Sequence, residues 1–185
     1  MRIISGTVRG RQLATFSGKD IRPTPDRVRE AIFSILNSRF GTFHGLKVLE
    51  LFAGSGAQSL EALSRGAESA TLVDSGNTAA EIIADNIKRC HFEANAHLIK
   101  QDVLQALPQL TASAPFDLIL LDPPYNQNLL PQIIEVIERL NLLAENGILC
   151  AESSKNEVLE DYGKLELIKN KVYGSTKIHL YCLTK

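Results

Sequence analysis

Cysteine is scarce in this chain of 185 residues, and its spacing excludes two common kinds of site. Cys90, Cys150 and Cys182 are odd in number and far apart. This pattern argues against a disulfide framework and against a Cys-x-x-Cys zinc site. The four histidines, at 44, 91, 97 and 179, also lack the spacing of metal ligands. We therefore predict no metal site and expect the thiols to be buried.

Long apolar segments are missing too. The longest purely aliphatic stretch runs from Leu118 to Leu121 and is flanked by two aspartates, whereas a membrane-spanning helix needs about 20 apolar residues. The N-terminus, MRIISG, has no apolar segment of the kind that directs secretion. The length suits one domain, and we see no internal repeat. These features predict a cytoplasmic globular protein with no membrane contact.

Acidic side chains are few at the N-terminal end. Residues 1–29 carry seven Arg or Lys and two Asp, a net charge of +5, so the remainder carries −6 within a total of −1. Such a basic segment predicts a polyanionic partner. A solvated basic tail with no specific partner is the alternative. The candidate RNA-contacting residues are the arginines of this segment: Arg2, Arg9, Arg11, Arg22 and Arg27.

Short β-prone pieces alternate with Gly6 and Gly10 over residues 2–16, which predicts a small β-hairpin that presents arginines. We expect this basic extension to occupy residues 1–21 and the main domain to occupy residues 22–185. Thr24 and Pro25 suit the start of a helix. Apolar residues at 28, 31, 32, 35 and 36 give that helix one buried face.

From residue 46 the pattern alternates between strand and helix, which predicts an α/β fold with a mostly parallel sheet and helices on both faces. The expected strands are 47–52, 69–74, 97–100, 117–122 and 147–152, and the expected helices are 57–65, 78–92, 103–110 and 129–140. Two further strand-like runs, 165–173 and 176–183, flank Gly174-Ser175. They predict a C-terminal hairpin with one antiparallel strand, giving seven strands in all.

A glycine turn follows the first expected strand of this sheet. The apolar run Val48–Phe52 leads into Gly54-Ser55-Gly56, and a helix-like segment begins at Ala57. Glycines let main-chain N–H groups at a helix N-terminus approach a polar ligand closely. A nucleotide-like cofactor is the natural ligand. The third glycine of the strict dinucleotide pattern is replaced by Ser59, which disfavours a pyrophosphate cofactor.

Two aspartates follow the next strands. In an open α/β sheet, ligands bind at the carboxyl ends of the strands. Asp74 comes 20 residues after Gly54, where a carboxylate that binds ribose hydroxyls is expected. Asp102 could accept a hydrogen bond from an amino group such as that of adenine, with Val103 as an apolar contact. Either aspartate alone could instead be a helix N-cap.

The fourth strand ends in Asp122-Pro123-Pro124-Tyr125. Prolines cannot donate to a β-ladder, so the backbone is stiff and the Pro123 carbonyl is available as an acceptor. Asp122 and this carbonyl could accept both hydrogens of an exocyclic amine, while Tyr125 offers a stacking face for a base. A surface turn is the alternative interpretation.

These motifs, in this order, resemble the S-adenosylmethionine-dependent amino-methyltransferases. Residues 22–30, RPTPDRVRE, and the basic N-terminus narrow the resemblance to the bacterial 16S ribosomal RNA (guanine(966)-N2)-methyltransferase family. It implies a Rossmann-like methyltransferase fold, S-adenosyl-L-methionine as cofactor and S-adenosyl-L-homocysteine as product. It also implies a monomer that methylates guanine N2 of 16S rRNA, within an assembled or assembling 30S particle.

The resemblance assigns roles residue by residue. Glu50 and the main chain at Phe52, Gly54 and Gly56 would hold the methionine part of the cofactor. Asp74 would hold the ribose, and Asp102 with Val103 the adenine. Asp122, Pro123 and Tyr125 would form the catalytic site for the amine. Asp74 stands where the family more usually has glutamate, and a shorter carboxylate can fill the same role.

Two other functions fit parts of the sequence. Related proline-rich tetrapeptides occur in enzymes that act on adenine N6 of DNA or RNA, and even on protein glutamine. A DNA enzyme is disfavoured because 185 residues leave no room for a domain that reads DNA sequence. A non-catalytic RNA-binding module on the same fold is the second alternative. A cofactor-binding measurement separates it from an enzyme.

Overall fold

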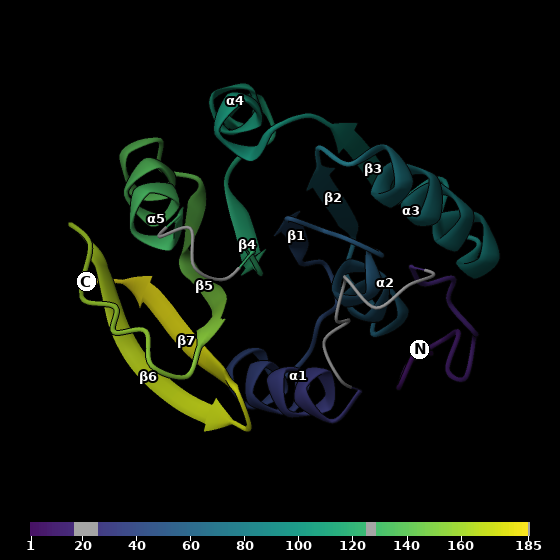
Figure 1. Ribbon diagram of the computed structural model, residues 1–185, viewed down its shortest axis with the longest axis horizontal. Coiled ribbons are helices and arrows are strands. Elements are labelled where there is room, and N and C mark those ends of the chain that lie inside the picture. The colour runs from purple at the N-terminus through teal and green to yellow at the C-terminus, as the bar shows by residue number, and fades with distance from the viewer. Residues whose placement is uncertain (17–25, 125–128, 185) are drawn as a thin grey trace.

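A seven-stranded sheet organises the protein in the computed structural model, which describes residues 1–16, 26–124 and 129–184 (Figure 1). The strand order is β3-β2-β1-β4-β5-β7-β6. Strands β1 to β5 pair in parallel, and β7 pairs antiparallel with β5 and β6. The elements are α1 (Asp26–Phe40), β1 (Lys47–Leu51), α2 (Ala57–Ser64), β2 (Ser69–Asp74), α3 (Asn77–Cys90), β3 (Ala96–Lys100), α4 (Val103–Ala106), η1 (Leu107–Ala112), β4 (Phe116–Leu121), α5 (Leu129–Arg139), β5 (Leu143–Ser154), β6 (Leu165–Tyr173) and β7 (Thr176–Leu183). The predicted mostly parallel sheet with an antiparallel C-terminal hairpin is confirmed.

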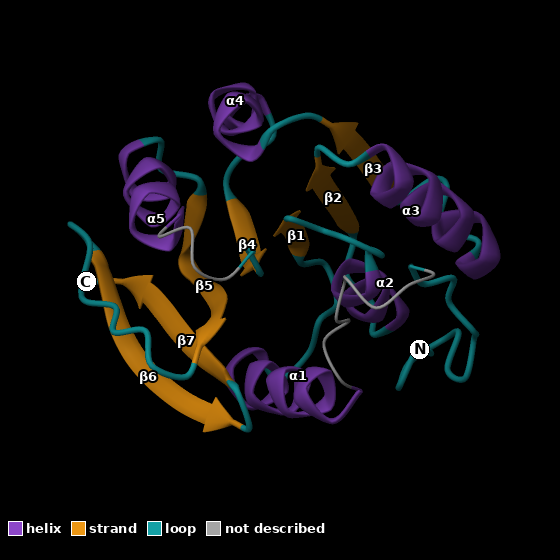
Figure 2. Ribbon diagram, viewed as in Figure 1, coloured by secondary structure: helices purple, strands orange, loops and turns teal. Residues whose placement is uncertain are grey.

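Helices cover both faces of the sheet (Figure 2). One core lies between the sheet and helices α1, α2 and α3, and the other lies between the sheet and α4, η1 and α5. Alternate residues of β1 enter different cores: Val48 enters the first and Leu49 the second. Strands buried on both faces need apolar residues at successive positions, which explains runs such as Leu118–Leu121. In the described parts of the chain, no helix has the length and apolar character to cross a membrane.

Two element boundaries differ from the prediction by more than two residues. The helix expected over 103–110 ends at Ala106 and continues as the 3₁₀-helix η1, because Pro108 has no N–H to continue an α-helical ladder. Strand β5 begins at Leu143 rather than near 147, through an irregularity in its pairing with β4. The predicted helix start at Thr24 and Pro25 lies outside the described residues.

The N-terminal arm, residues 1–16, folds back on itself as a small, irregular hairpin. A single antiparallel bridge joins Arg2 to Gln12, and no strand forms within these sixteen residues. Three main-chain hydrogen bonds join its two sides: Ile3 N to Arg11 O at 3.0 Å, Gly10 N to Ile3 O at 2.9 Å and Leu13 N to Met1 O at 3.1 Å. Other main-chain groups of the arm bind α2. Ile4 N and Ser5 N donate to the carboxylate of Glu61 on α2, at 2.7 and 3.0 Å. The arm is therefore bound to α2 by its own backbone.

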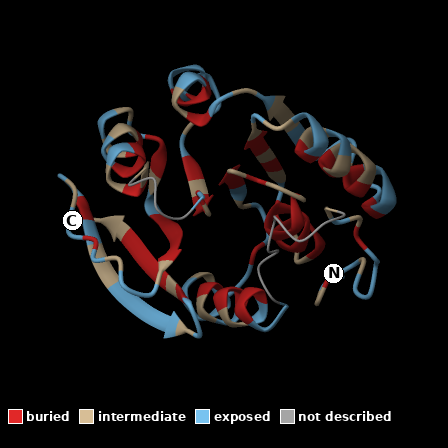
Figure 3. Cartoon of the chain, viewed as in Figure 1, coloured by how far each residue is buried: buried red, intermediate tan, exposed pale blue. Residues whose placement is uncertain are grey.

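Helix α2 lies between the sheet and this arm. All eight of its residues are buried (Figure 3). Gly6 sits directly on the helix with φ +90°, and a Cβ at Gly6 would overlap the carbonyl oxygen of Ser64. The close approach of arm and helix therefore requires glycine at this position.

One basic residue of the N-terminal segment, Arg29, is not a surface charge. Arg29 on α1 is 1% exposed, and its Nη2 donates to the carbonyl oxygen of Arg2 and to Asp26 Oδ1. It connects α1 to the arm. Four of the predicted RNA-contacting arginines are exposed: Arg2, Arg9, Arg11 and Arg27. Arg22 lies outside the described residues.

Candidate active site

The carboxyl ends of β1, β4 and β5 meet at one edge of the sheet. Leu51 pairs with Leu121, and Leu121 pairs with Ala151. Asp122, which follows Leu121 of β4, and Glu152, which follows Ala151 in β5, therefore lie level with the start of the glycine turn. Asp122 N also makes a long hydrogen bond, 3.5 Å, to the carbonyl oxygen of Leu51. The register thus brings the turn and the proline-rich segment together.

The glycine turn has a backbone that ordinary residues rarely adopt. Phe52, Gly54 and Gly56 have φ angles of 59°, 56° and 72°. Gly56 is also required by space, since a Cβ there would lie 2.8 Å from Leu72 Cδ2. Positive φ at a half-buried phenylalanine is uncommon and is characteristic of strained functional loops. The strain lies where the sequence predicted a cofactor.

Asp74 braces this turn from β2. Its Oδ2 accepts a hydrogen bond from Gly54 N, and its Oδ1 accepts one from Gly76 N, both at 2.8 Å. Each carboxylate oxygen can accept more than one hydrogen bond, so a ribose hydroxyl can still bind. The structure places Asp74 against the turn, and it shows a bracing role that the sequence did not predict.

Glu50 is buried beneath the turn, with 5% of its surface exposed. Its Oε2 accepts a hydrogen bond of 2.9 Å from Ser59 N in the first turn of α2. Burial, with a smaller contribution from the negative charge of Asp122, raises the pKa of Glu50 to about 7 against the opposing effect of the hydrogen bonds from Ser59. The carboxyl group can therefore change its charge near neutral pH when a cation binds.

Sequence reasoning missed Glu152. It is 2% exposed, and its Oε1 accepts a hydrogen bond of 2.7 Å from Gln58 Nε2 on α2. Burial, and then the charge of Asp122, raise the pKa of Glu152 well above its usual range. The signal was present, because Glu152 follows the apolar run Ile148–Ala151. The inspection of strand ends that identified Asp74 and Asp122 would also have identified it.

Three carboxyl groups thus gather at the carboxyl ends of the central strands: Glu50, Asp122 and Glu152. They come from β1, from the residue after β4, and from β5. The charge of Asp122 acts on the other two. Such a group suits a cationic ligand, because a positive charge lowers the cost of ionising all three. Among the described residues, no set of His, Cys, Asp and Glu side chains is arranged to hold a metal ion.

The proline-rich segment is described as far as Pro124. Asp122 is half-buried, Pro123 is buried and Pro124 is exposed. Tyr125, predicted to stack on a base, lies outside the described residues. The observed part of the segment follows β4 directly, as predicted.

Asp102 is an exposed helix N-cap. Its Oδ1 accepts hydrogen bonds from Leu104 N at 3.0 Å and Gln105 N at 3.3 Å. The side chain of Val103 is buried. This capping is the alternative that the sequence left open. Strand β3 lies two positions from β1 in the sheet, so Asp102 lies farther along the same edge than Asp74.

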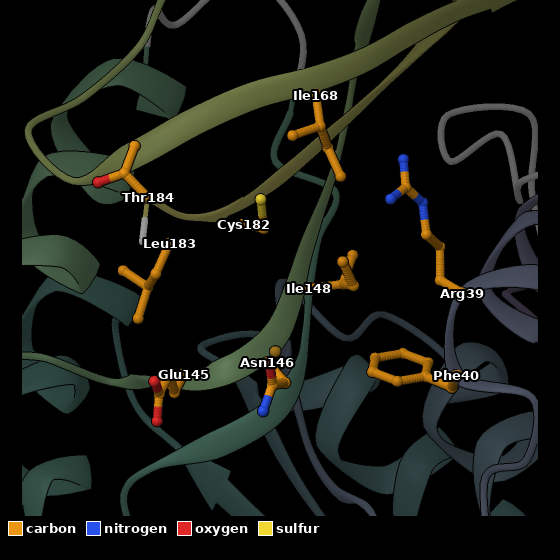
Figure 4. Close-up of a pocket in the computed structure, with 10 residues that line it drawn as sticks. Arg39, Phe40, Glu145, Asn146, Ile148, Ile168, Cys182, Leu183 and Thr184 are labelled. Carbon is orange, nitrogen blue, oxygen red and sulfur yellow. The ribbon is translucent and has the colours of Figure 1, made fainter.

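A hollow of about 660 Å³ lies at the opposite edge of the sheet (Figure 4). It is lined by the end of α1, the start of β5, and residues of β6 and β7. Apolar side chains such as Phe40, Ile148 and Ile168 share the lining with Arg39 and Glu145. Ligands of open α/β sheets bind at the carboxyl ends of the parallel strands. We therefore place the candidate site at the carboxyl edge and not in this hollow.

The buried carboxyl group of Glu50 predicts a pH dependence of stability. Its pKa of about 7 exceeds the ordinary 4.5, so the folded protein binds more protons than the unfolded chain between these values. The free energy of unfolding should fall as pH rises through this range. Glu50→Gln removes this loss. The unfolding free energy of the variant minus that of the wild type should therefore increase by about 2 kcal/mol between pH 5 and pH 8. Urea unfolding at both pH values measures the gain, and parallel pH profiles would contradict it.

Comparison with known proteins places the whole chain in one family. Residues 1–182 match the family described as conserved hypothetical protein 95. Ribosomal RNA small subunit methyltransferase D of Haemophilus influenzae is 35% identical over 98% of this chain and 93% of its own. The Escherichia coli protein of the same name is 32% identical over 98% and 89%.

A solved structure agrees with this assignment. The Escherichia coli protein yhhF superposes with a TM-score of 0.86 at 33% identity, covering 99% of this chain and 97% of its own. The chain therefore belongs to the conserved hypothetical protein 95 family, together with proteins named as small-subunit ribosomal RNA methyltransferases.

Proposed function

We propose that this protein transfers a methyl group from S-adenosyl-L-methionine to the exocyclic N2 amine of a guanine in 16S ribosomal RNA. One observation carries the proposal most directly. The register of β1 and β4 places Asp122 beside the glycine turn, so an amine acceptor lies next to a nucleotide-type loop. The names of the full-length relatives support ribosomal RNA of the small subunit as the substrate class.

The residues present fit this cofactor. Its methionine part carries an ammonium group and its sulfur is a sulfonium, so the ligand brings positive charge to the carboxyl groups of Glu50, Asp122 and Glu152. The strained turn leads into the N-terminus of α2, where polar ligand atoms bind well. Asp74 is anchored by two backbone N–H groups and retains lone pairs for ribose hydroxyls.

The protein's own task in the reaction is to orient the amine. When bound, the cofactor supplies an electrophilic methyl group. Asp122 and the Pro123 carbonyl each accept a hydrogen bond from one N–H of the amine. These two bonds turn the nitrogen lone pair out of the ring plane and toward the methyl group. Asp122 then accepts the proton that the methylated nitrogen loses. We propose Tyr125 as the stacking face for the base, which must be unstacked to enter the site.

Two alternatives are separated by experiment. An adenine-N6 enzyme would use the same Asp122 and Pro123 acceptors, so identification of the methylated nucleoside distinguishes it. A non-catalytic RNA-binding module would bind RNA without transferring a methyl group. The direct test is transfer from labelled cofactor to 16S rRNA and to 30S particles from cells that lack the enzyme. Label recovered as N2-methylguanosine supports the proposal, and label in any other nucleoside overturns it.

Asp74 provides a test of the cofactor site. Asp74→Ala removes the acceptor of Gly54 N in the turn and the carboxylate proposed to bind ribose, and it should weaken S-adenosylmethionine binding by about 1.5–3 kcal/mol, as measured by calorimetry. Asp85→Ala is the matched control, because Asp85 is an exposed carboxylate whose partner is Arg89 on the same helix. It should leave the affinity unchanged. No binding by the wild type would refute the cofactor assignment, and equal losses in the two variants would refute the role of Asp74.

Asp122 provides a test of the chemical step. Asp122→Ala should lower the single-turnover methylation rate about 100-fold or more and weaken cofactor binding much less, because the hydrogen bond to the amine matters most in the transition state and Glu50 and Glu152 still face the cofactor. Asp117→Ala is the control. Asp117 lies on the same strand, and its Oδ2 accepts a hydrogen bond of 2.8 Å from Lys47 N at the opposite edge. If Asp122→Ala lowers only the melting temperature, the segment is a structural turn.

The exposed arginines of the arm provide a test of RNA binding. Arg9→Ala with Arg11→Ala should weaken RNA binding and reduce the slope of log affinity against log salt by about one to two units, because phosphate contacts are lost. Cofactor affinity should not change. Arg139→Ala with Lys169→Ala is the control, since these exposed residues lie on α5 and β6. A salt slope equal to that of the wild type would mean that the arm is a solvated tail.

A further inference from the structure

Asn86 joins two parts of the protein that the sequence treats as separate. It lies on α3 with no exposed surface. Its Oδ1 accepts a hydrogen bond of 2.7 Å from Ala14 N in the N-terminal arm. Its Nδ2 donates to the Ala14 carbonyl at 3.0 Å and to the Ser55 carbonyl at 2.9 Å. One amide therefore binds both the arm and the middle residue of the glycine turn.

The hydrogen-bonding capacity of this side chain is well matched to its partners. A primary amide offers two donors and one acceptor oxygen. Asn86 pairs with the N–H and the C=O of Ala14 as a neighbouring strand would, and its second donor goes to Ser55. Replacing the side chain leaves three partly buried main-chain groups of the arm and the turn without their partner, and such groups are costly to leave unpaired.

Both ends of the arm also border the turn directly. The sulfur of Met1 lies 3.7 Å from Ser55 Oγ. A Cβ placed on Gly54 would lie 3.8 Å from the ring of Phe16. The middle of the arm is held elsewhere, because Ser64 at the far end of α2 bonds to Ser5 O and Val8 N. The contacts that could respond to a ligand at the turn are thus at the ends of the arm.

We propose that Asn86 is a positioning residue that links occupation of the cofactor turn to docking of the N-terminal arm. A ligand that fixes the turn fixes the Ser55 carbonyl, which orients the Asn86 amide toward Ala14. The linkage is reciprocal, so a docked arm favours the turn that binds cofactor. The arm carries Arg9 and Arg11 between its two ends, so cofactor binding stabilises the ends that flank the surface proposed to contact RNA. This inference rests on the proposed cofactor, S-adenosylmethionine, and extends it.

Hydrogen exchange measures the linkage without an activity assay. The Ala14 amide can exchange only when its bond to Asn86 opens. In the wild type, saturating S-adenosylmethionine should slow exchange at Ala14 about tenfold, the effect of strengthening one hydrogen bond. In Asn86→Ala, calorimetry should show binding weakened about tenfold, and the cofactor should no longer slow exchange in the arm. Asn86→Asp keeps the acceptor for Ala14 N and loses both donors, so it should behave similarly and serves if the alanine variant does not fold.

Ser64→Ala is the matched control. It removes a side chain that holds the arm but does not contact the turn. Hydrogen exchange near residues 5–8 should become faster in this variant. Its cofactor affinity should stay within about twofold of the wild type, and S-adenosylmethionine should still slow amide exchange at Ala14. A wild type that binds S-adenosylmethionine with unchanged exchange in the arm overturns the linkage and leaves the proposed function intact. A wild type that binds no S-adenosylmethionine overturns both.

Discussion

The parallel register between β1 and β4 is the constraint on which the site depends. Leu51 opposite Leu121 sets the glycine turn level with Asp122. A slip of one residue in either strand would turn Glu50 or Asp122 to the other face of the sheet, into the core beneath α4 and α5. The apolar residues of both strands enforce the register, because Leu118 and Leu120 belong to one core, and Ile119 and Leu121 to the other. Packing of β1 and β4 in the two cores therefore determines how the glycine turn and Asp122 lie at the carboxyl edge of the sheet.

The same edge concentrates features that disfavour folding. Glu50 and Glu152 are buried carboxyl groups with raised pKa values, and Phe52 has a positive φ. Each is costly in a protein without ligand. They occur together at the carboxyl ends of three adjacent strands. Features that cost stability, such as buried carboxyl groups and strained backbone, tend to gather at functional sites. A cationic ligand that also contacts the turn would relieve the electrostatic part of this cost.

Most of the fold could be predicted because its signals are local. Apolar runs, helix periodicity and glycine turns each occupy a few consecutive residues, so β2 was bounded correctly and α5 to within one residue. The site was predicted in part by the same means, since Asp74 and Asp122 end strands. The bracing of Gly54 by Asp74 was not, because it needs the pairing of β1 with β2. Glu152 was overlooked although its strand end was recognised.

The N-terminal arm shows what local reasoning misses. Its glycines and β-prone residues predict the small hairpin that forms, but not its docking on α2, where Ile4 N and Ser5 N donate to Glu61, nearly sixty residues away in sequence. Glu61 and Ser64 are polar residues on the outer side of α2, a pattern that predicts solvent exposure. They are buried instead, because they bind the backbone of the arm. The outer surface of α2 is therefore a contact surface for the arm, and the basic segment is continuous with the structure that supports the glycine turn. A substitution in the arm should consequently be judged by its effect on the turn as well as by the charge that it removes.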